Sequence, residues 1–101
     1  MTREEHLLTI IAEECAEIAK AASKALRFGL DNHNPQEDET NAVLMHREYL
    51  DLTTVMQMLS NESAQMRDAI NKVSFPTAMV AKKNKVEHFL EYSKSVGRLT
   101  E

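Results

Sequence analysis

The sequence predicts an all-α fold, a helical bundle of three to four helices within one domain over residues 1–101. Only 2 Gly and 2 Pro are present, too few for the many tight turns of a β-sandwich or barrel. Ala, Glu, Leu, Lys and Met, which favour helices, are abundant. Apolar residues recur with the period of a helix, and no useful length alternates apolar and polar residues as a strand does.

Local signals fix the expected ends of the first helix. Thr2 followed by Glu5 is a capping box, and Gly29 is a natural stop. We therefore expect a helix that begins at the capping box and ends at Phe28. A polar loop follows over 31–39, in which Asn34-Pro35 with Glu37 is a candidate cap for the next helix.

Three further helices are expected along the rest of the chain. The second covers about 40–59, and the polar stretch 60–63 predicts a break. A short third helix is expected over 64–73, and the stretch 74–77, which contains Pro76, interrupts again. The last helix is expected over about 77–96, with a stop at Gly97.

Composition and charge exclude several classes of protein. The net charge is −4, so nothing global favours DNA or RNA as a partner, and the run Lys82-Lys83-Asn84-Lys85 lacks a surrounding basic stripe. Cys15, the single cysteine, forms no internal disulfide, which favours a reducing compartment. No apolar run reaches the roughly 20 residues of a membrane span, and the acidic N-terminus has no signal-peptide pattern. We therefore expect a cytoplasmic protein with no membrane or nucleic-acid partner.

The first helix carries carboxylates where apolar side chains are expected. On a wheel of about 100° per residue, Glu14 lies at the centre of the apolar face and Glu17 at its edge. Glu13 lies on the polar side, together with Lys20 and Lys24. The apolar face comprises Leu7, Ile10, Ile11, Ile18, Ala21 and Ala25.

The second helix repeats this arrangement, with Glu48 at the centre of its apolar face and Asp51 at the edge. That face comprises Leu44, Met45, Leu52, Val55 and Leu59. Buried carboxylates of one sign persist if they are protonated, paired with buried cations, or bound to a metal. One such acid would be taken as an exposed surface residue, but the same offset in two helices favours a site. Four hard oxygen ligands suit Mg²⁺ or Mn²⁺.

The last helix offers complementary charge. Lys82 lies at the centre of its apolar face, and Lys85 and Tyr92 lie at the edge. Acids that hold a divalent cation beside inward lysines predict a polyphosphate site. The alternative is that Lys82 extends past the core into solvent.

Two short motifs resemble a known family. Glu13-Glu14-Cys15-Ala16-Glu17 matches Glu-Glu-x-x-Glu, and Glu48-Tyr49-Leu50-Asp51 matches Glu-x-x-Asp. Together they resemble the all-α nucleoside triphosphate pyrophosphohydrolases, which include MazG, the dimeric dUTPases and the phosphoribosyl-ATP pyrophosphohydrolases. The chain looks most like the short, single-domain MazG-like branch. The segment between the two motifs, residues 18–47, is at or beyond the long end of the family's usual spacer, and its added length falls in the polar loop.

The resemblance implies a bundle completed by dimerisation, as a homodimer or a homotetramer built as a dimer of dimers. It implies that water attacks between the α and β phosphorus of a nucleoside triphosphate, releasing a nucleoside monophosphate and pyrophosphate. The implied roles are Mg²⁺ binding by Glu14, Glu17, Glu48 and Asp51, orientation of the water or support of the ligands by Glu13, phosphate binding by Lys82 and Lys85, and base or sugar contacts by Tyr92, Phe89 and the loop at 32–39.

A competing hypothesis is a non-enzymatic helical dimerisation or regulatory module. It requires the inward acids to be paired with Lys or Arg across the interface. Under either hypothesis the apolar arcs of the two long helices are too wide for a monomeric bundle, which predicts an oligomer.

Overall fold

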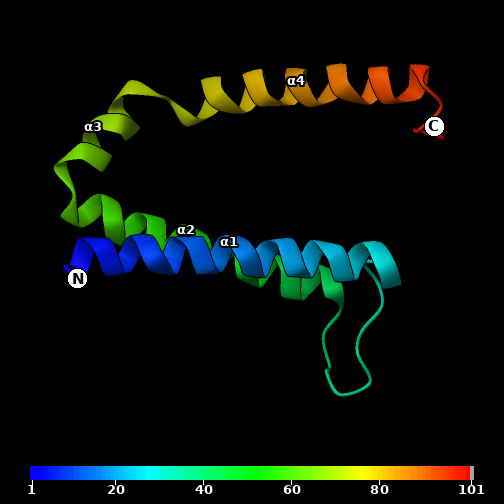
Figure 1. Ribbon diagram of the computed structural model, residues 1–101, viewed down its shortest axis with the longest axis horizontal. Coiled ribbons are helices and arrows are strands. Elements are labelled where there is room, and N and C mark those ends of the chain that lie inside the picture. The colour runs from blue at the N-terminus through cyan, green and yellow to red at the C-terminus, as the bar shows by residue number, and fades with distance from the viewer. Residues whose placement is uncertain (101) are drawn as a thin grey trace. The chain divides into compact units, whose positions relative to one another are not determined.

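The computed structural model describes residues 1–100, and all of its regular structure is helical (Figure 1). The predicted all-α class is therefore confirmed, and no strand occurs among the described residues. The chain forms two compact units, residues 1–66 and the residues from 67 onward, and each is described by itself. The four helices are α1 (Arg3–Phe28), α2 (Asn41–Glu62), α3 (Ala64–Lys72) and α4 (Phe75–Ser95).

Helix α1 begins and ends where its local signals predict. The Glu5 backbone N–H donates to the Thr2 hydroxyl at 3.1 Å, and the Thr2 N–H donates to the Glu5 carboxylate at 2.9 Å, which completes the capping box. At the other end Gly29 adopts a φ of 98°, a conformation that favours glycine, and its N–H donates to the Ala25 carbonyl.

Helices α1 and α2 pack along each other in the first unit, with opposite chain directions (Figure 1). An ion pair between Arg3, at the start of α1, and Glu62, at the end of α2, joins one end of this hairpin. The faces predicted to point inward are the less exposed ones, because the apolar side chains listed for them, together with Glu14 and Glu48, are half-buried or buried. Glu17 and Asp51, at the edges of these faces, are exposed. Leu7 and Leu59 are the fully buried apolar side chains of the described chain.

The predicted break within 60–63 occurs at Ser63, but the predicted end of the second helix near residue 59 is wrong, because α2 continues to Glu62. The polar side chains of this segment bond within the helix instead of ending it. The Ser60 hydroxyl donates to the Gln57 carbonyl at 2.8 Å, and the Gln57 amide donates to the Asn61 side chain at 3.1 Å. The end comes at Ser63, which is 2% exposed and whose hydroxyl accepts the Met66 N–H that begins α3.

The loop between α1 and α2 contains turns, so the predicted helix cap at Asn34-Pro35 is also wrong. The Asn34 side chain accepts the Gln36 N–H at 2.9 Å, which closes a turn. Thr40 caps α2 instead, since its hydroxyl accepts the Val43 N–H at 3.3 Å.

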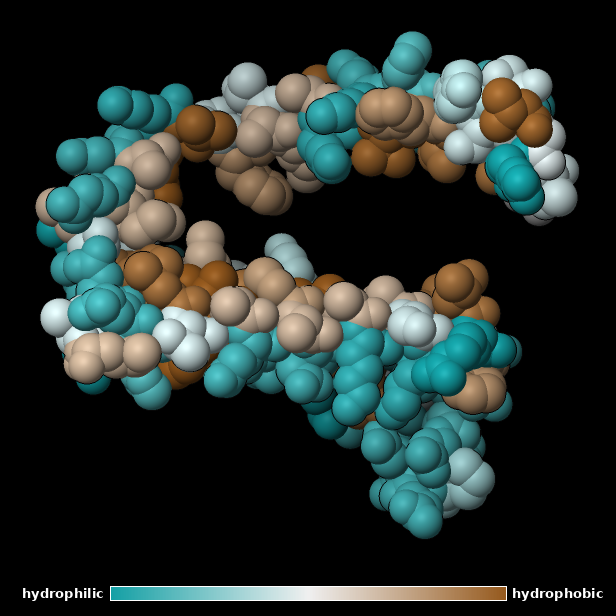
Figure 2. Space-filling model, in the orientation of Figure 1, coloured by the Kyte–Doolittle hydropathy of each residue, from teal (hydrophilic) through white to brown (hydrophobic). Residues whose placement is uncertain are grey.

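Helix α4 begins two residues before the predicted position. Ser74 is its N-cap, with the hydroxyl accepting the Thr77 N–H at 3.3 Å, and Pro76 lies in the first turn, where no backbone N–H is required. Apart from Ser93, the side chains of α4 are exposed, including Val80 and Phe89. Figure 2 shows apolar side chains at the surface of this helix. Among the described helices, none is long and apolar enough to cross a lipid bilayer.

Candidate functional site

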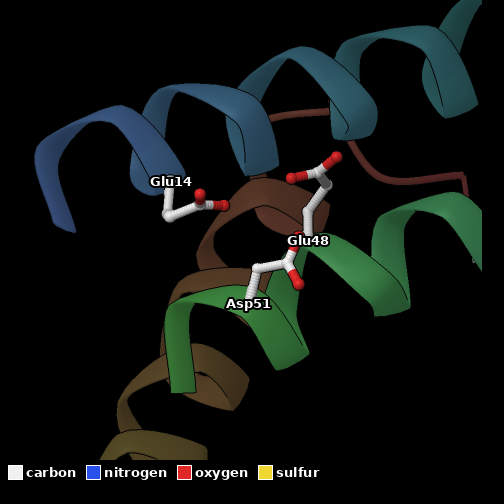
Figure 3. A group of neighbouring side chains, drawn as sticks. All are labelled: Glu14, Glu48 and Asp51. Carbon is white, nitrogen blue, oxygen red and sulfur yellow. The ribbon is translucent and has the colours of Figure 1, made fainter. Parts of the chain in front are cut away.

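Three carboxylates from the two packed helices converge in the first unit. Glu14 projects from α1, and Glu48 and Asp51 project from consecutive turns of α2 (Figure 3). Each offers one carboxylate oxygen, and these three oxygens lie within 4.8 Å of one another. The three residues come from both predicted motifs, so the packing of α1 on α2 brings the motifs together as expected.

Glu14 is the most confined of the three acids. Its Oε2 atom is buried and has no hydrogen-bond partner. Loss of hydration raises the pKa of Glu14 above its ordinary value of 4.5, and the negative charges of Asp51, Glu48 and Glu17 raise it further. The site therefore disfavours the accumulated negative charge that it holds, which a bound cation would relieve.

None of these acids forms an ion pair within residues 1–100. The ion pairs of the first unit join Arg3 to Glu62 and Arg47 to Glu39, away from the three carboxylates. Neighbouring protein cations therefore do not neutralise the group inside this unit. Its oxygen atoms are those that Mg²⁺, Mn²⁺ and other hard cations prefer.

Glu17 lies on α1 outside the three-oxygen group, but it lines an adjoining pocket of about 210 Å³. Glu48 also lines this pocket and so connects it to the carboxylate group. The remaining lining residues are Lys20, Ala21, Lys24, Glu37, Asn41 and Leu44.

Lys20 and Lys24 were not among the residues predicted for the site. The helical period places them on the polar side of α1, yet they line the pocket beside the carboxylates. The sequence signal was their spacing, because Lys20 and Lys24 follow Glu17 at three and seven residues and therefore lie along one side of the helix. Whether that side faces a pocket depends on where α2 and the loop pack.

Four further residues were predicted for the site, namely Glu13, Lys82, Lys85 and Tyr92. Glu13 is exposed on α1, outside both the three-oxygen group and the pocket. Lys82, Lys85 and Tyr92 are exposed on α4, in the second unit. The site that can be described from side-chain contacts thus belongs to α1, α2 and the loop between them.

Comparison with protein-family models, curated proteins and solved structures finds no match to this chain.

Proposed function

We propose that this chain is a nucleoside triphosphate pyrophosphohydrolase that depends on Mg²⁺, with Mn²⁺ able to replace it. The main observation behind this proposal is the position of Glu48. It belongs to the group of three carboxylates, and it also lines the pocket that Lys20 and Lys24 line. Acids that hold a cation next to lysines suit a substrate that is itself a metal–polyphosphate complex. The two acidic motifs of the resemblance support the same activity.

The carboxylate group fits a hard divalent cation. The buried, unpartnered oxygen of Glu14 lacks any compensating donor, and a cation would satisfy it. Glu14, Glu48 and Asp51 would hold the ion, and Glu17 is the fourth candidate ligand, at the edge of the pocket. When bound, the ion neutralises negative charge that develops on the phosphates during the reaction.

In the proposed reaction, the oxygen of water bonds to the α-phosphorus. The bond from that phosphorus to the bridging oxygen breaks, the pair of electrons leaves with pyrophosphate, and the proton that the water loses passes to solvent. Lys20 and Lys24 bind the phosphate oxygens in the pocket and so orient the chain of phosphates. Glu13, exposed beside Glu14, is the candidate for orienting the water.

We further propose that the active form is a homodimer or a homotetramer. In the first unit only Leu7 and Leu59 are fully buried apolar side chains, and α4 has none. Helices stay folded in water mainly by packing an apolar face. A core of this size is too small to stabilise a chain of this length. A second copy would supply the missing apolar contacts.

Product analysis tests the activity. The wild-type protein is incubated with a panel of ribo- and deoxyribonucleoside triphosphates and Mg²⁺, with Glu48→Gln as the control for contaminating hydrolases. We expect pyrophosphate and a nucleoside monophosphate, and no turnover in EDTA. Formation of orthophosphate and a diphosphate, or activity that survives EDTA, would overturn the mechanism. A calorimetric Mg²⁺ titration separates this proposal from a non-enzymatic dimerisation module, which predicts no specific binding.

A further inference from the structure

A second pocket of about 230 Å³ adjoins the first one. Lys24 and Asn41 line both pockets, so the two share a wall. Each is smaller than the roughly 300–1,000 Å³ of a typical small-molecule site, whereas the two together fall within that range. The other residues of the second pocket are Phe28, Asn32, His33, Asn34 and Pro35, from the end of α1 and the loop that follows.

Phe28 gives the second pocket an aromatic wall. It follows Lys24 by one helical turn, which places both side chains on the same side of α1. The guanidinium carbon of Arg27 lies 5.1 Å from the centroid of the Phe28 ring and covers one of its faces. The ring is nonetheless 58% exposed, so area remains on which a planar group can stack.

Asn41 joins the loop to the end of α1. It is 6% exposed, its side-chain amide donates to the Gly29 carbonyl at 2.9 Å, and its backbone N–H donates to the Asn32 carbonyl at 2.8 Å. These bonds fix the orientation of the amide, and Oδ1 accepts no hydrogen bond among the described residues. Asn41 therefore places a fixed acceptor at the wall between the two pockets.

The loop presents further polar groups to the second pocket. Nδ1 of His33 lies 2.9 Å from the Glu37 carbonyl and 3.1 Å from the Asn34 carbonyl, so it carries a hydrogen, and Nε2 makes no hydrogen bond within the described part of the chain. The Asn32 side chain makes no hydrogen bond within the described part of the chain. An exposed ring beside unpaired amide and imidazole groups can recognise a flat molecule with donors and acceptors on its edge.

We infer that this second pocket binds the base of the same nucleotide whose phosphates occupy the first pocket, with Phe28 stacking on the base and Asn32 contacting its edge. This inference rests on the proposed function. The order of groups in a nucleotide matches the order of the two pockets, because the sugar lies between the phosphates and the base. Asn41, at the wall between the pockets, would offer an acceptor to a sugar hydroxyl. Base selectivity would therefore reside in the end of α1 and the loop that follows it.

Two matched substitutions near the end of α1 test the stacking. Phe28→Ala removes the aromatic wall, and Leu26→Ala removes a nearby exposed apolar side chain that lines neither pocket. We expect Phe28→Ala to raise KM for nucleoside triphosphates by about tenfold or more, as loss of a base–aromatic stack does. Inorganic tripolyphosphate, which has no base, should inhibit Phe28→Ala and the wild type with the same inhibition constant. Leu26→Ala should match the wild type in both measurements, and Phe28→Tyr should restore the low KM.

A fourth variant, Asn32→Ala, tests the edge contact. It should change the ratio of kcat/KM between bases, whereas Phe28→Ala should lower kcat/KM for all of them. Equal KM values for Phe28→Ala and Leu26→Ala would overturn the base pocket and leave the proposed hydrolysis standing. An equal rise in KM and in the tripolyphosphate inhibition constant would also overturn it, because the defect would then concern phosphate binding. If the wild type hydrolyses no nucleoside triphosphate, the proposed function fails and the base pocket fails with it.

Discussion

Glu14 on α1 and Glu48 on α2 point toward each other, with carboxylate oxygens within 4.8 Å (Figure 3). Burial and the surrounding charges raise the pKa of Glu14, so the pair is unfavourable when both acids are ionised and no cation is present. A divalent cation bound between the two carboxylates would attract both of them and offset their mutual repulsion. The relationship therefore predicts that stability and activity respond in opposite directions when one of the charges is removed.

We expect Glu48→Gln to separate function from stability. The amide keeps the shape of the side chain and removes one negative charge from the group. Activity should fall by about 100-fold or more, whereas the melting temperature in EDTA should be at least that of the wild type. Mg²⁺ should raise the wild-type melting temperature, because it binds only the folded state, and should raise that of the variant less. Thermal melts with and without Mg²⁺ measure both effects.

Glu87→Gln is the matched control for this variant, since Glu87 is an exposed acid on α4. It should retain activity and the Mg²⁺ response. If Glu48 were half of a buried salt bridge, loss of its charge would leave a cation unpaired and cost about 3–5 kcal/mol. A strongly destabilised Glu48→Gln protein, together with no Mg²⁺ response in the wild type, would remove the metal site.

The raised pKa of Glu14 predicts a pH dependence of the metal-free protein. Because the folded-state pKa exceeds the ordinary value of 4.5, the contribution of Glu14 to stability is complete below pH 4.5 and is lost as the pH rises through the folded-state pKa. Glu5 acts in the opposite sense, since hydrogen bonds to Thr2 lower its pKa and its contribution is lost as the pH falls. The melting temperature of wild type minus that of Glu14→Gln, measured in EDTA, isolates the first effect.

We expect this difference to become more negative as the pH rises above 4.5, and to lose that slope in Mg²⁺. If the difference in melting temperature in EDTA did not change with pH, it would contradict a raised pKa for Glu14 in the folded protein.

Much of α1 and of the site could be predicted because the signals are local. The capping box at Thr2 and the stop at Gly29 act within one turn, and the helical period alone places Glu14 and Glu48 on the faces that pack together. The two acidic motifs then meet because α1 and α2 form an antiparallel pair.

Features that depend on contacts between distant segments could not be predicted. Lys24 lies on the polar side of an isolated α1 and lines a pocket only because α2 and the loop lie beside it. Asn41 is polar and begins a helix, so nothing local indicates that it is buried against Gly29. The predicted end of α2 near residue 59 is wrong for a related reason. Ser60 and Asn61 are compatible either with a loop or with a helix in which they bond to Gln57.

Removal of a pocket lysine should weaken substrate binding. We expect Lys24→Ala to raise KM about tenfold, because a charge-assisted hydrogen bond to phosphate is lost. Melting temperature should change little, since no ion pair of Lys24 would be broken. Steady-state kinetics measure the effect, and Lys72→Ala, an exposed lysine at the end of α3, is the matched control. Equal kinetics for the two variants would contradict a phosphate site in the pocket.

Lys82 on α4 tests the part of the resemblance that lies outside the first unit. If it binds phosphate in the assembled enzyme, Lys82→Ala should lower kcat/KM by about tenfold or more without unfolding the protein. Circular dichroism checks the fold, and Lys83→Ala, one position along the same helix, is the control. Activity within a few-fold of the wild type would assign Lys82 to solvent and leave Lys20 and Lys24 as the phosphate ligands.

The exposed apolar side chains predict an obligate oligomer. Leu50 on α2 is 47% exposed and Phe89 on α4 is 55% exposed, although both are residues that usually lie in a core. A helix such as α4, with no buried side chain of its own, is marginal in water unless a partner covers its apolar face. If a second copy supplies that cover, the folded state is stabilised by mass action, so the melting temperature should rise with protein concentration.

Light scattering after size exclusion should give a dimer or a tetramer at every concentration at which the protein is active. A stable 11.5 kDa monomer that retains activity, with a melting temperature independent of concentration, would contradict the prediction.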